Sequence, residues 1–186
     1  MSKIYFTSDL HFGHDKDFLW SPRGFTSSRE HDETIIRKWN LLINPEDTVY
    51  ILGDCMLKDD EYGMRCLKRL NGQLKFIRGN HDSNNRWSAY ATLPNAELLG
   101  HANVLKYNKY NFYISHYPTI TSNYDFYKPL TRRVINLCGH CHTKDKFLDF
   151  DKGIIYHVEL DAHNCLPVLL DDIIEDIKEK LKEESE

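Results

Sequence analysis

Residues 74–82 read Leu-Lys-Phe-Ile-Arg-Gly-Asn-His-Asp, a short apolar run that ends in a cluster of polar side chains. Such a run, bounded by glycine, is typical of a buried strand. Two earlier segments have the same form, since Lys3–Thr7 leads into the polar residues 8–14 and Thr48–Leu52 ends at Gly53-Asp54. Polar groups therefore follow each expected strand, at the edge where open α/β sheets place their sites.

Amphipathic segments separate these three strands. Ser27 and Glu30 have the spacing of a capping box, and apolar residues then recur at a helical period until Asn44-Pro45. Residues 59–70 have a similar pattern and end before Asn71-Gly72. The order strand, helix, strand, helix, strand over the first part of the chain predicts a parallel sheet with crossover helices.

The second half of the chain has a different order. A hairpin is expected about Asn108-Lys109, followed by two further strands and a terminal helix that begins near Leu170. The expected strands are Asn103–Tyr107, Tyr110–Ser115, Arg133–Leu137 and Ile154–Leu160. We find no internal repeat, linker or low-complexity segment, so residues 1–186 are predicted to form a single domain of the mixed α/β class.

Composition excludes several classes of protein. Hydrophobic residues make up 41% of the 186 residues and charged residues 28%, which excludes intrinsic disorder and a disulfide scaffold. The net charge of −4 does not favour nucleic acid as a partner. No stretch approaches the ~18 apolar residues of a membrane span, no signal-peptide pattern follows Met1, and the five cysteines are an odd number. We therefore expect a reduced, cytoplasmic protein without a membrane partner.

The polar residues at the expected strand ends form a set of metal ligands. Carboxylate, imidazole and amide oxygen suit Mn²⁺, Fe²⁺/Fe³⁺ or Zn²⁺. The set is too large for one tetrahedral ion, and a carboxylate such as Asp54 can bridge two ions. Two ions ~3.5–4 Å apart bind the attacking and leaving oxygens of a displacement at phosphorus. The sequence thus predicts a dinuclear metal-dependent hydrolase built from Asp9, His11, Asp54, Asn80, His81, Asp82, His116, His140 and His142.

These residues resemble the pattern of the calcineurin-like metallophosphoesterases. That pattern is D-x-H, G-D, G-N-H-D/E, a lone His and G-H-x-H, and all five blocks occur here in order between residues 9 and 142. The similarity is to the small single-domain bacterial and phage members. It implies an αββα sandwich in which two mixed sheets are flanked by helices. Leu160–Pro167 also resembles the strand that closes these small members.

The resemblance implies a role for each residue. One ion would be held by Asp9, His11, Asp54 and His142, and the other by Asp54, Asn80, His116 and His140. A hydroxide between the ions would attack phosphorus. His81 would be the general acid that faces the leaving-group oxygen, with Asp82 orienting it. The implied activity is hydrolysis of a phosphate ester, with a small molecule or nucleotide as substrate and phosphodiesters slightly favoured over phosphomonoesters.

Other residues admit more than one interpretation. His14 either contacts the substrate phosphate or only hydrogen-bonds its own loop, and Asn80 is a second candidate for contact with substrate. Loop cations that could flank the site are Arg23, Arg29, Lys128, Arg132 and Arg133. The remaining histidines lie outside any motif and are expected to be structural or on the surface, namely His31, His101, His157 and His163.

Residues 138–142, Cys-Gly-His-Cys-His, also match a C-x-x-C redox pair and the C-x-x-C-H haem attachment pattern. Neither explains Asp9, Asp54 or Asn80, and no haem is expected. Cys138 is expected to be a small buried residue, and Cys141 to point out of the site if the segment is extended.

The alternative function is that of a metal-binding or scaffold protein of the same fold with little turnover. The presence of His81 argues against it, because a scaffold needs no general acid.

Overall fold

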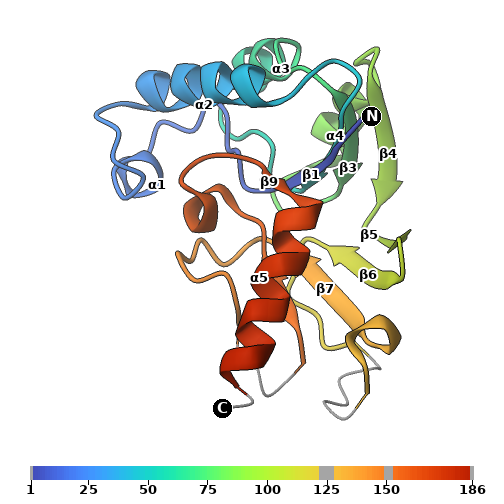
Figure 1. Cartoon of the computed structure of the whole chain (residues 1–186). Helices are drawn as coiled ribbons and strands as arrows, with labels where there is room; N and C mark the ends of the chain where they lie inside the picture. Colours follow the sequence, from blue (N-terminus) through green and yellow to red (C-terminus); the bar gives the residue numbers. More distant parts are fainter. Residues whose placement is uncertain (1, 122–127, 149–152, 185–186) are drawn as a thin grey trace.

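The computed structural model describes residues 2–121, 128–148 and 153–184, in which the strands form two sheets (Figure 1). The first sheet has the order β4-β3-β2-β1-β9, and the second has the order β5-β6-β7-β8. The strands of the first sheet are β1 (Ile4–Thr7), β2 (Thr48–Leu52), β3 (Gln73–Ile77), β4 (Ala96–Gly100) and β9 (Val168–Leu169). Those of the second are β5 (Ala102–Tyr107), β6 (Tyr110–Ser115), β7 (Val134–Cys138) and β8 (Ile155–His157).

Both sheets are mixed. In the first, β1 to β4 are parallel and β9 runs antiparallel to β1. In the second, the hairpin β5–β6 is antiparallel, whereas β6, β7 and β8 are parallel to one another. The carboxyl ends of three neighbouring strands therefore meet on one edge of the first sheet, and those of β6 and β7 meet in the second.

Helices connect and flank the sheets. The longer ones are α2 (Ser28–Leu42), α3 (Asp60–Leu67), α4 (Asn84–Tyr90) and α5 (Leu170–Glu183). The shorter ones are α1 (Asp17–Trp20), η1 (Leu130–Arg132) and η3 (Leu160–His163). The side chain of Ser27 accepts a hydrogen bond from the Glu30 amide at the start of α2, as the sequence predicts. No helix within the described ranges has the length and apolar content that a bilayer crossing requires.

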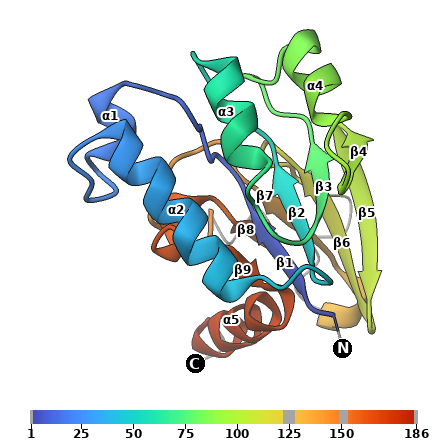
Figure 2. The same cartoon turned by 90° about the horizontal axis from the view of Figure 1, so that it is seen from above.

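Alternating side chains divide the interior into two apolar clusters. Along β2, Val49 and Ile51 face the cluster that contains Trp39 of α2, whereas Tyr50 and Leu52 face the second sheet. This is the period of two that a strand imposes. The first sheet is thus buried on both faces, with α2, α3 and α4 over its outer face (Figure 2).

The cluster between the sheets also receives the apolar face of α5, including Ile173, Ile174 and Ile177. The terminal helix therefore closes the space between the two sheets. Its position beside β1 and β9 is visible in Figure 2. Two mixed sheets with flanking helices are thus confirmed.

One expected strand differs from the sequence prediction. The strand expected over Ile154–Leu160 is shorter, and the segment Leu160–Pro167 is not the closing strand. Asn164 and Cys165 have φ angles of 53° and 60°, which an extended strand does not accommodate. The segment forms the 3-10 turn η3, and the two-residue strand β9 pairs with β1 in its place.

Candidate functional site

The five sequence motifs meet at the end of the molecule where strands of both sheets have their carboxyl ends. Asp9 and His11 follow β1, Asp54 follows β2, and residues 79–82 follow β3. From the second sheet, His116 follows β6, and His140 and His142 follow β7. Because parallel strands end at the same edge of a sheet, residues as far apart in sequence as Asp9 and His142 meet in one site.

The motif glycines allow these loops to approach each other. A Cβ atom on Gly79 would lie 2.2 Å from Oδ1 of Asp54, and one on Gly139 would lie 2.4 Å from Oδ2 of Asp9. Any larger residue would displace a carboxylate of the site. Gly79 and Gly139 are therefore required by the close packing around the acidic groups.

Backbone strain is concentrated in the same loops. Five residues of the site have φ angles in the left-handed region, which is uncommon for residues other than glycine, although Asn, Asp and His adopt it more often than the rest. They are Asp9 (57°), His11 (50°), Asp54 (53°), His140 (75°) and His142 (49°). Each such conformation lowers the free energy of unfolding by roughly 1–2 kcal/mol. The backbone is therefore strained at the positions that orient the side chains of the site.

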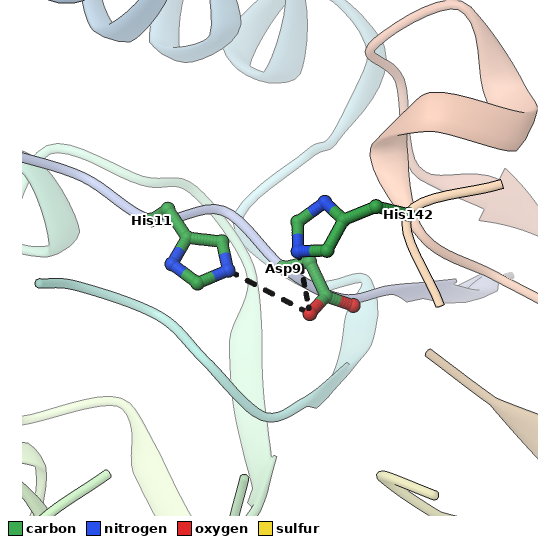
Figure 3. Close-up of side chains that lie close together, drawn as sticks. All are labelled: Asp9, His11 and His142. Carbon is green, nitrogen blue, oxygen red and sulfur yellow. Dashed lines mark ion pairs between the residues drawn. The ribbon is translucent and has the colours of Figure 1, made fainter. Parts of the chain in front are cut away.

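A first group of ligand-type atoms is formed by Asp9, His11 and His142, whose candidate atoms lie within 4.8 Å of one another. Oδ1 of Asp9 is 3.7 Å from Nε2 of His11 and 3.6 Å from Nε2 of His142. Figure 3 shows both imidazoles directed at this carboxylate. Oδ2 of the same carboxylate accepts a hydrogen bond from the His140 amide, which fixes its orientation.

A second group is formed by Asp54, His116 and His140. Nδ1 of His116 donates to the Leu52 carbonyl at 2.7 Å, so Nε2 of the neutral ring carries the lone pair. That lone pair faces Oδ1 of Asn80 at 2.8 Å and Oδ2 of Asp54 at 3.5 Å. Three acceptor atoms thus converge, an arrangement that a cation stabilises.

Asp54 lies between the two groups. Its Oδ2 atom is 3.5 Å from Nε2 of His116 and 3.8 Å from Nε2 of His11. Its Oδ1 atom accepts a hydrogen bond from the His81 amide. One carboxylate oxygen is therefore available to both groups of ligands.

The residues fit a pair of metal ions. Oδ1 of Asp9 and both ring nitrogens of His11 are buried and have no hydrogen-bond partner among the described residues. Unpaired buried polar atoms are costly, and a bound cation would satisfy the Asp9 oxygen and the ring nitrogen of His11 that carries the lone pair. His116 and His142 each direct the second ring nitrogen at a carbonyl or carboxylate, as metal-ligating histidines commonly do.

Burial sets the titration of these groups. Desolvation raises the pKa of Asp54 to about 6, although the charge of His116 acts in the opposite direction. Desolvation lowers the pKa of His11 to about 4, so this ring is neutral at pH 7. For His142, burial alone would lower the pKa, but the hydrogen bond to Asp161 raises it.

His81 faces the site from the surface. Its side chain is 42% exposed, and Nε2 lies 3.9 Å from Oδ2 of Asp54. The ring meets that of His11 edge-on, with centroids 5.5 Å apart.

Asp82 is buried beside the loops that follow β2 and β3. The residue was predicted to orient His81, but its Oδ2 atom accepts hydrogen bonds from the Asp54 and Gly79 amides. Its Oδ1 atom accepts from the Tyr90 hydroxyl at 2.7 Å. The described hydrogen bonds of this carboxylate therefore tie the loop that follows β2 to the loop that follows β3, and none of them reaches the His81 ring.

An ion-pair network beside His142 was not predicted. Arg23 donates from Nε and Nη2 to both carboxylate oxygens of Asp161, at 2.9 and 2.7 Å, and from Nη2 to the Asp9 carbonyl. Asp161 also accepts from Nδ1 of His142 at 3.1 Å. Arg23 was a candidate only as one of several loop cations, and Asp161 lies outside every motif.

His31, expected to be structural or on the surface, belongs to the same network. Nη1 of Arg23 donates to its Nε2 atom, and its Nδ1 atom donates to Asp32. The other oxygen of Asp32 accepts from the Gly13 amide. The network therefore also fastens the loop that carries Asp9 and His11.

A cavity of about 490 Å³ opens onto both groups of ligands. His11, Asp54, Asn80, His81, His140 and His142 line it, together with Asp161. His14 and the apolar side chains of Phe18, Leu19, Pro22 and Leu57 complete the wall. Nδ1 of His14 is buried and has no hydrogen-bond partner among the described residues.

The cysteines of residues 138–142 lie outside this cavity. Cys138 is fully buried, as expected, and Cys141 is exposed. The direction of Cys141 arises from a turn and not from an extended strand, because His140 and His142 on either side have left-handed φ angles.

Comparison with known proteins agrees with this geometry. The sequence profile of the calcineurin-like phosphoesterase superfamily domain matches residues 3–156. An uncharacterized protein of Methanocaldococcus jannaschii is 31% identical over 179 residues, covering 94% of this chain and 90% of that protein. The gene 66 protein of Mycobacterium phage D29 is 28% identical over 213 residues, covering 97% of this chain and the whole of that protein.

Among solved structures, a protein of unknown function from Aquifex aeolicus has the same fold, with a TM-score of 0.71 at 20% identity. The match covers 94% of this chain and 99% of that one. This match confirms the predicted fold class, and the sequence profile confirms the predicted family. The chain belongs to the calcineurin-like phosphoesterase superfamily.

Proposed function

We propose that the protein hydrolyses a phosphate ester at a pair of divalent ions, with His81 as the proton donor to the leaving group. The observation that carries this proposal is the position of Asp54, whose Oδ2 atom lies within 3.8 Å of imidazole nitrogens from both groups of ligands. A carboxylate shared in this way is typical of a dinuclear site.

The proposed ligands of one ion are Asp9, His11, Asp54 and His142. Those of the other are Asp54, Asn80, His116 and His140. The two groups described above support this division, since each brings together one carboxylate and two imidazoles. The donor set suits Mn²⁺, Fe²⁺/Fe³⁺ or Zn²⁺ and does not select among them.

When bound, two such ions supply a water molecule whose pKa is near 7 and neutralise charge on the phosphoryl oxygens. The residues of the chain hold the ions and orient the phosphoryl group of the substrate. Asp9 and Asp54 hold the ions at a fixed edge of the sheet. His14 and Asn80 line the cavity, where the side-chain amide of Asn80 can donate a hydrogen bond to a phosphoryl oxygen.

His81 is placed to protonate the leaving oxygen. Its ring is on the cavity wall and half exposed, so a substrate can reach it, while its backbone amide is fixed by Asp54. Protonation matters most when a sugar or nucleoside alkoxide leaves, because such alkoxides are poor leaving groups. This argument slightly favours phosphodiesters over phosphomonoesters.

The test is hydrolysis of bis(p-nitrophenyl) phosphate and p-nitrophenyl phosphate by the purified protein after chelation and reloading with Mn²⁺, Zn²⁺ or Fe²⁺. We expect activity that disappears on chelation and returns with metal. His101→Gln is the matched control, because His101 is an exposed histidine outside the site. Two bound ions without turnover on any phosphate ester would instead support the scaffold function.

A further inference from the structure

We infer that the apolar wall of the cavity is a binding site for the leaving group of the substrate, and that this group is a flat, uncharged ring system. The inference rests on the proposed function, which it refines by naming a class of substrate. It concerns the wall formed by Phe18, Leu19 and Leu57, which the mechanism above does not use.

A row of rings connects the proton donor to this wall. The His11 ring lies 5.5 Å from that of His81 and 5.7 Å from that of His14, measured between centroids. The His14 ring in turn lies 5.5 Å from that of Phe18, at an interplanar angle of 83°. Phe18 is therefore next to His14, and it is connected to His81 through the rings of His14 and His11, all of which line the same cavity.

The side chain of Phe18 is exposed and lines the cavity. Its neighbour Leu19 is only 5% exposed and anchors α1, whereas Phe18 is 69% exposed. The segment that precedes α1 is fastened by the hydrogen bond from the Gly13 amide to Asp32. A single exposed aromatic residue is unremarkable on an open surface, but here it lines a cavity beside a candidate catalytic histidine. Aromatic side chains in such positions stack on flat rings.

The charge of the wall indicates that the bound group is neutral. Among the described residues that line the cavity there is no lysine or arginine, and the acidic lining residues are Asp54 and Asp161. A second phosphate on the leaving group would contact no basic side chain of the lining, whereas Lys16 and Lys58 act on His14 only from outside it. Lysines occur instead in the adjacent cleft beyond Pro22, which Lys38 and Lys144 line.

The size of the cavity limits the ligand to one small molecule. At about 490 Å³, it lies within the range of roughly 300–1,000 Å³ found for small-molecule sites. The substrate class is therefore a phosphate ester of an aryl-bearing or nucleobase-bearing alcohol.

Affinity for two phosphonates tests this inference without turnover. We would measure the dissociation constants of methylphosphonate and naphthylmethylphosphonate for the Mn²⁺-loaded protein by calorimetry. The naphthyl compound should bind about 5- to 100-fold more tightly, which is the gain in affinity expected from one aromatic stacking contact. In Phe18→Ala this ratio should fall to about 2 or less, and in Phe18→Trp it should be kept. Leu41→Ala, which removes a side chain that is 79% exposed on α2, should leave the ratio as in the wild type.

A ratio near one in the wild type, or a large ratio that Phe18→Ala does not change, would overturn the inference. Hydrolysis of bis(p-nitrophenyl) phosphate by the same preparations reports on the proposed function separately. Turnover with a ratio near one rejects only the ring site, whereas a Phe18-dependent ratio without turnover rejects only the enzymatic function. Binding of neither phosphonate rejects the ring site together with the anion site on which it depends.

Discussion

Replacement of Arg23 by methionine tests whether the buried ion pair beside His142 holds the site together. The Arg23 side chain is 1% exposed, and that of its partner Asp161 is 10% exposed. Methionine keeps most of the apolar stem but leaves Asp161 buried without its guanidinium partner. Removing one member of a buried pair typically costs about 3–5 kcal/mol, because the remaining charge is uncompensated. We expect a loss of that size in the free energy of unfolding.

The chain contains a matched control for this experiment. Arg69 forms a bidentate pair with Glu33, with both distances at 2.7 Å, but the two side chains are 48% and 44% exposed. Surface pairs contribute about 0–1 kcal/mol, so Arg69→Met should cost no more than that. The assay is urea unfolding of the metal-free proteins at pH 7 followed by circular dichroism.

Metal binding provides a second readout of the same variant. Asp161 accepts a hydrogen bond from His142, so an Arg23→Met protein should hold that imidazole less firmly. The loss of such a supporting contact typically costs 10–100-fold in metal affinity. Equal unfolding free energies for Arg23→Met and Arg69→Met, with unchanged metal affinity, would refute the role assigned to the network.

Three further predictions concern Asp54, His81 and pH. Asp54→Asn should be the most damaging single ligand change, because it should lower the affinity for both ions at once. Near-native turnover with two tightly bound ions would show that the shared carboxylate is wrongly assigned. His81→Gln should keep both ions in elemental analysis but lower kcat on alkyl esters by about 10²–10⁴. The loss should be smaller on p-nitrophenyl esters, because their leaving group needs no proton. Equal losses on both types of ester would indicate a binding role for His81. Metal affinity should fall as the pH drops below about 6, because burial raises the pKa of Asp54 to about 6 and a protonated carboxyl cannot bind a cation. The raised pKa of His142 acts in the same direction, and calorimetry that finds equal affinity at pH 5 and pH 7 would contradict this assignment.

The sequence predicted those parts of the site that follow strands. An apolar run such as Thr48–Leu52 has to be buried, and the residues after it have to lie at the edge of the sheet. For this reason the positions of Asp54, residues 79–82 and His116 could be inferred without coordinates. The helices α2, α3 and α5 were predictable because each has a regular apolar face.

The remaining parts depend on contacts that no local pattern records. Arg23 and Asp161 are 138 positions apart, and each resembles an ordinary polar loop residue in the sequence. The helices α1 and α4 were not predicted because they are too short to show a clear periodicity, and β4 was not predicted because Ala-Glu-Leu-Leu-Gly contains no β-branched or aromatic residue. Asp82 was assigned to orient His81 because the resemblance to the family implies it, whereas the carboxylate accepts hydrogen bonds from the backbone of the neighbouring loops.

The central claim is that Asp54 lies between two metal ions, and anomalous diffraction from crystals of the Mn²⁺-loaded protein tests it most directly. The account predicts two peaks about 3.5–4 Å apart, one beside Asp9, His11 and His142 and the other beside His116 and His140, with the Asp54 carboxylate in contact with both. A single peak, or two peaks of which only one contacts Asp54, would contradict it.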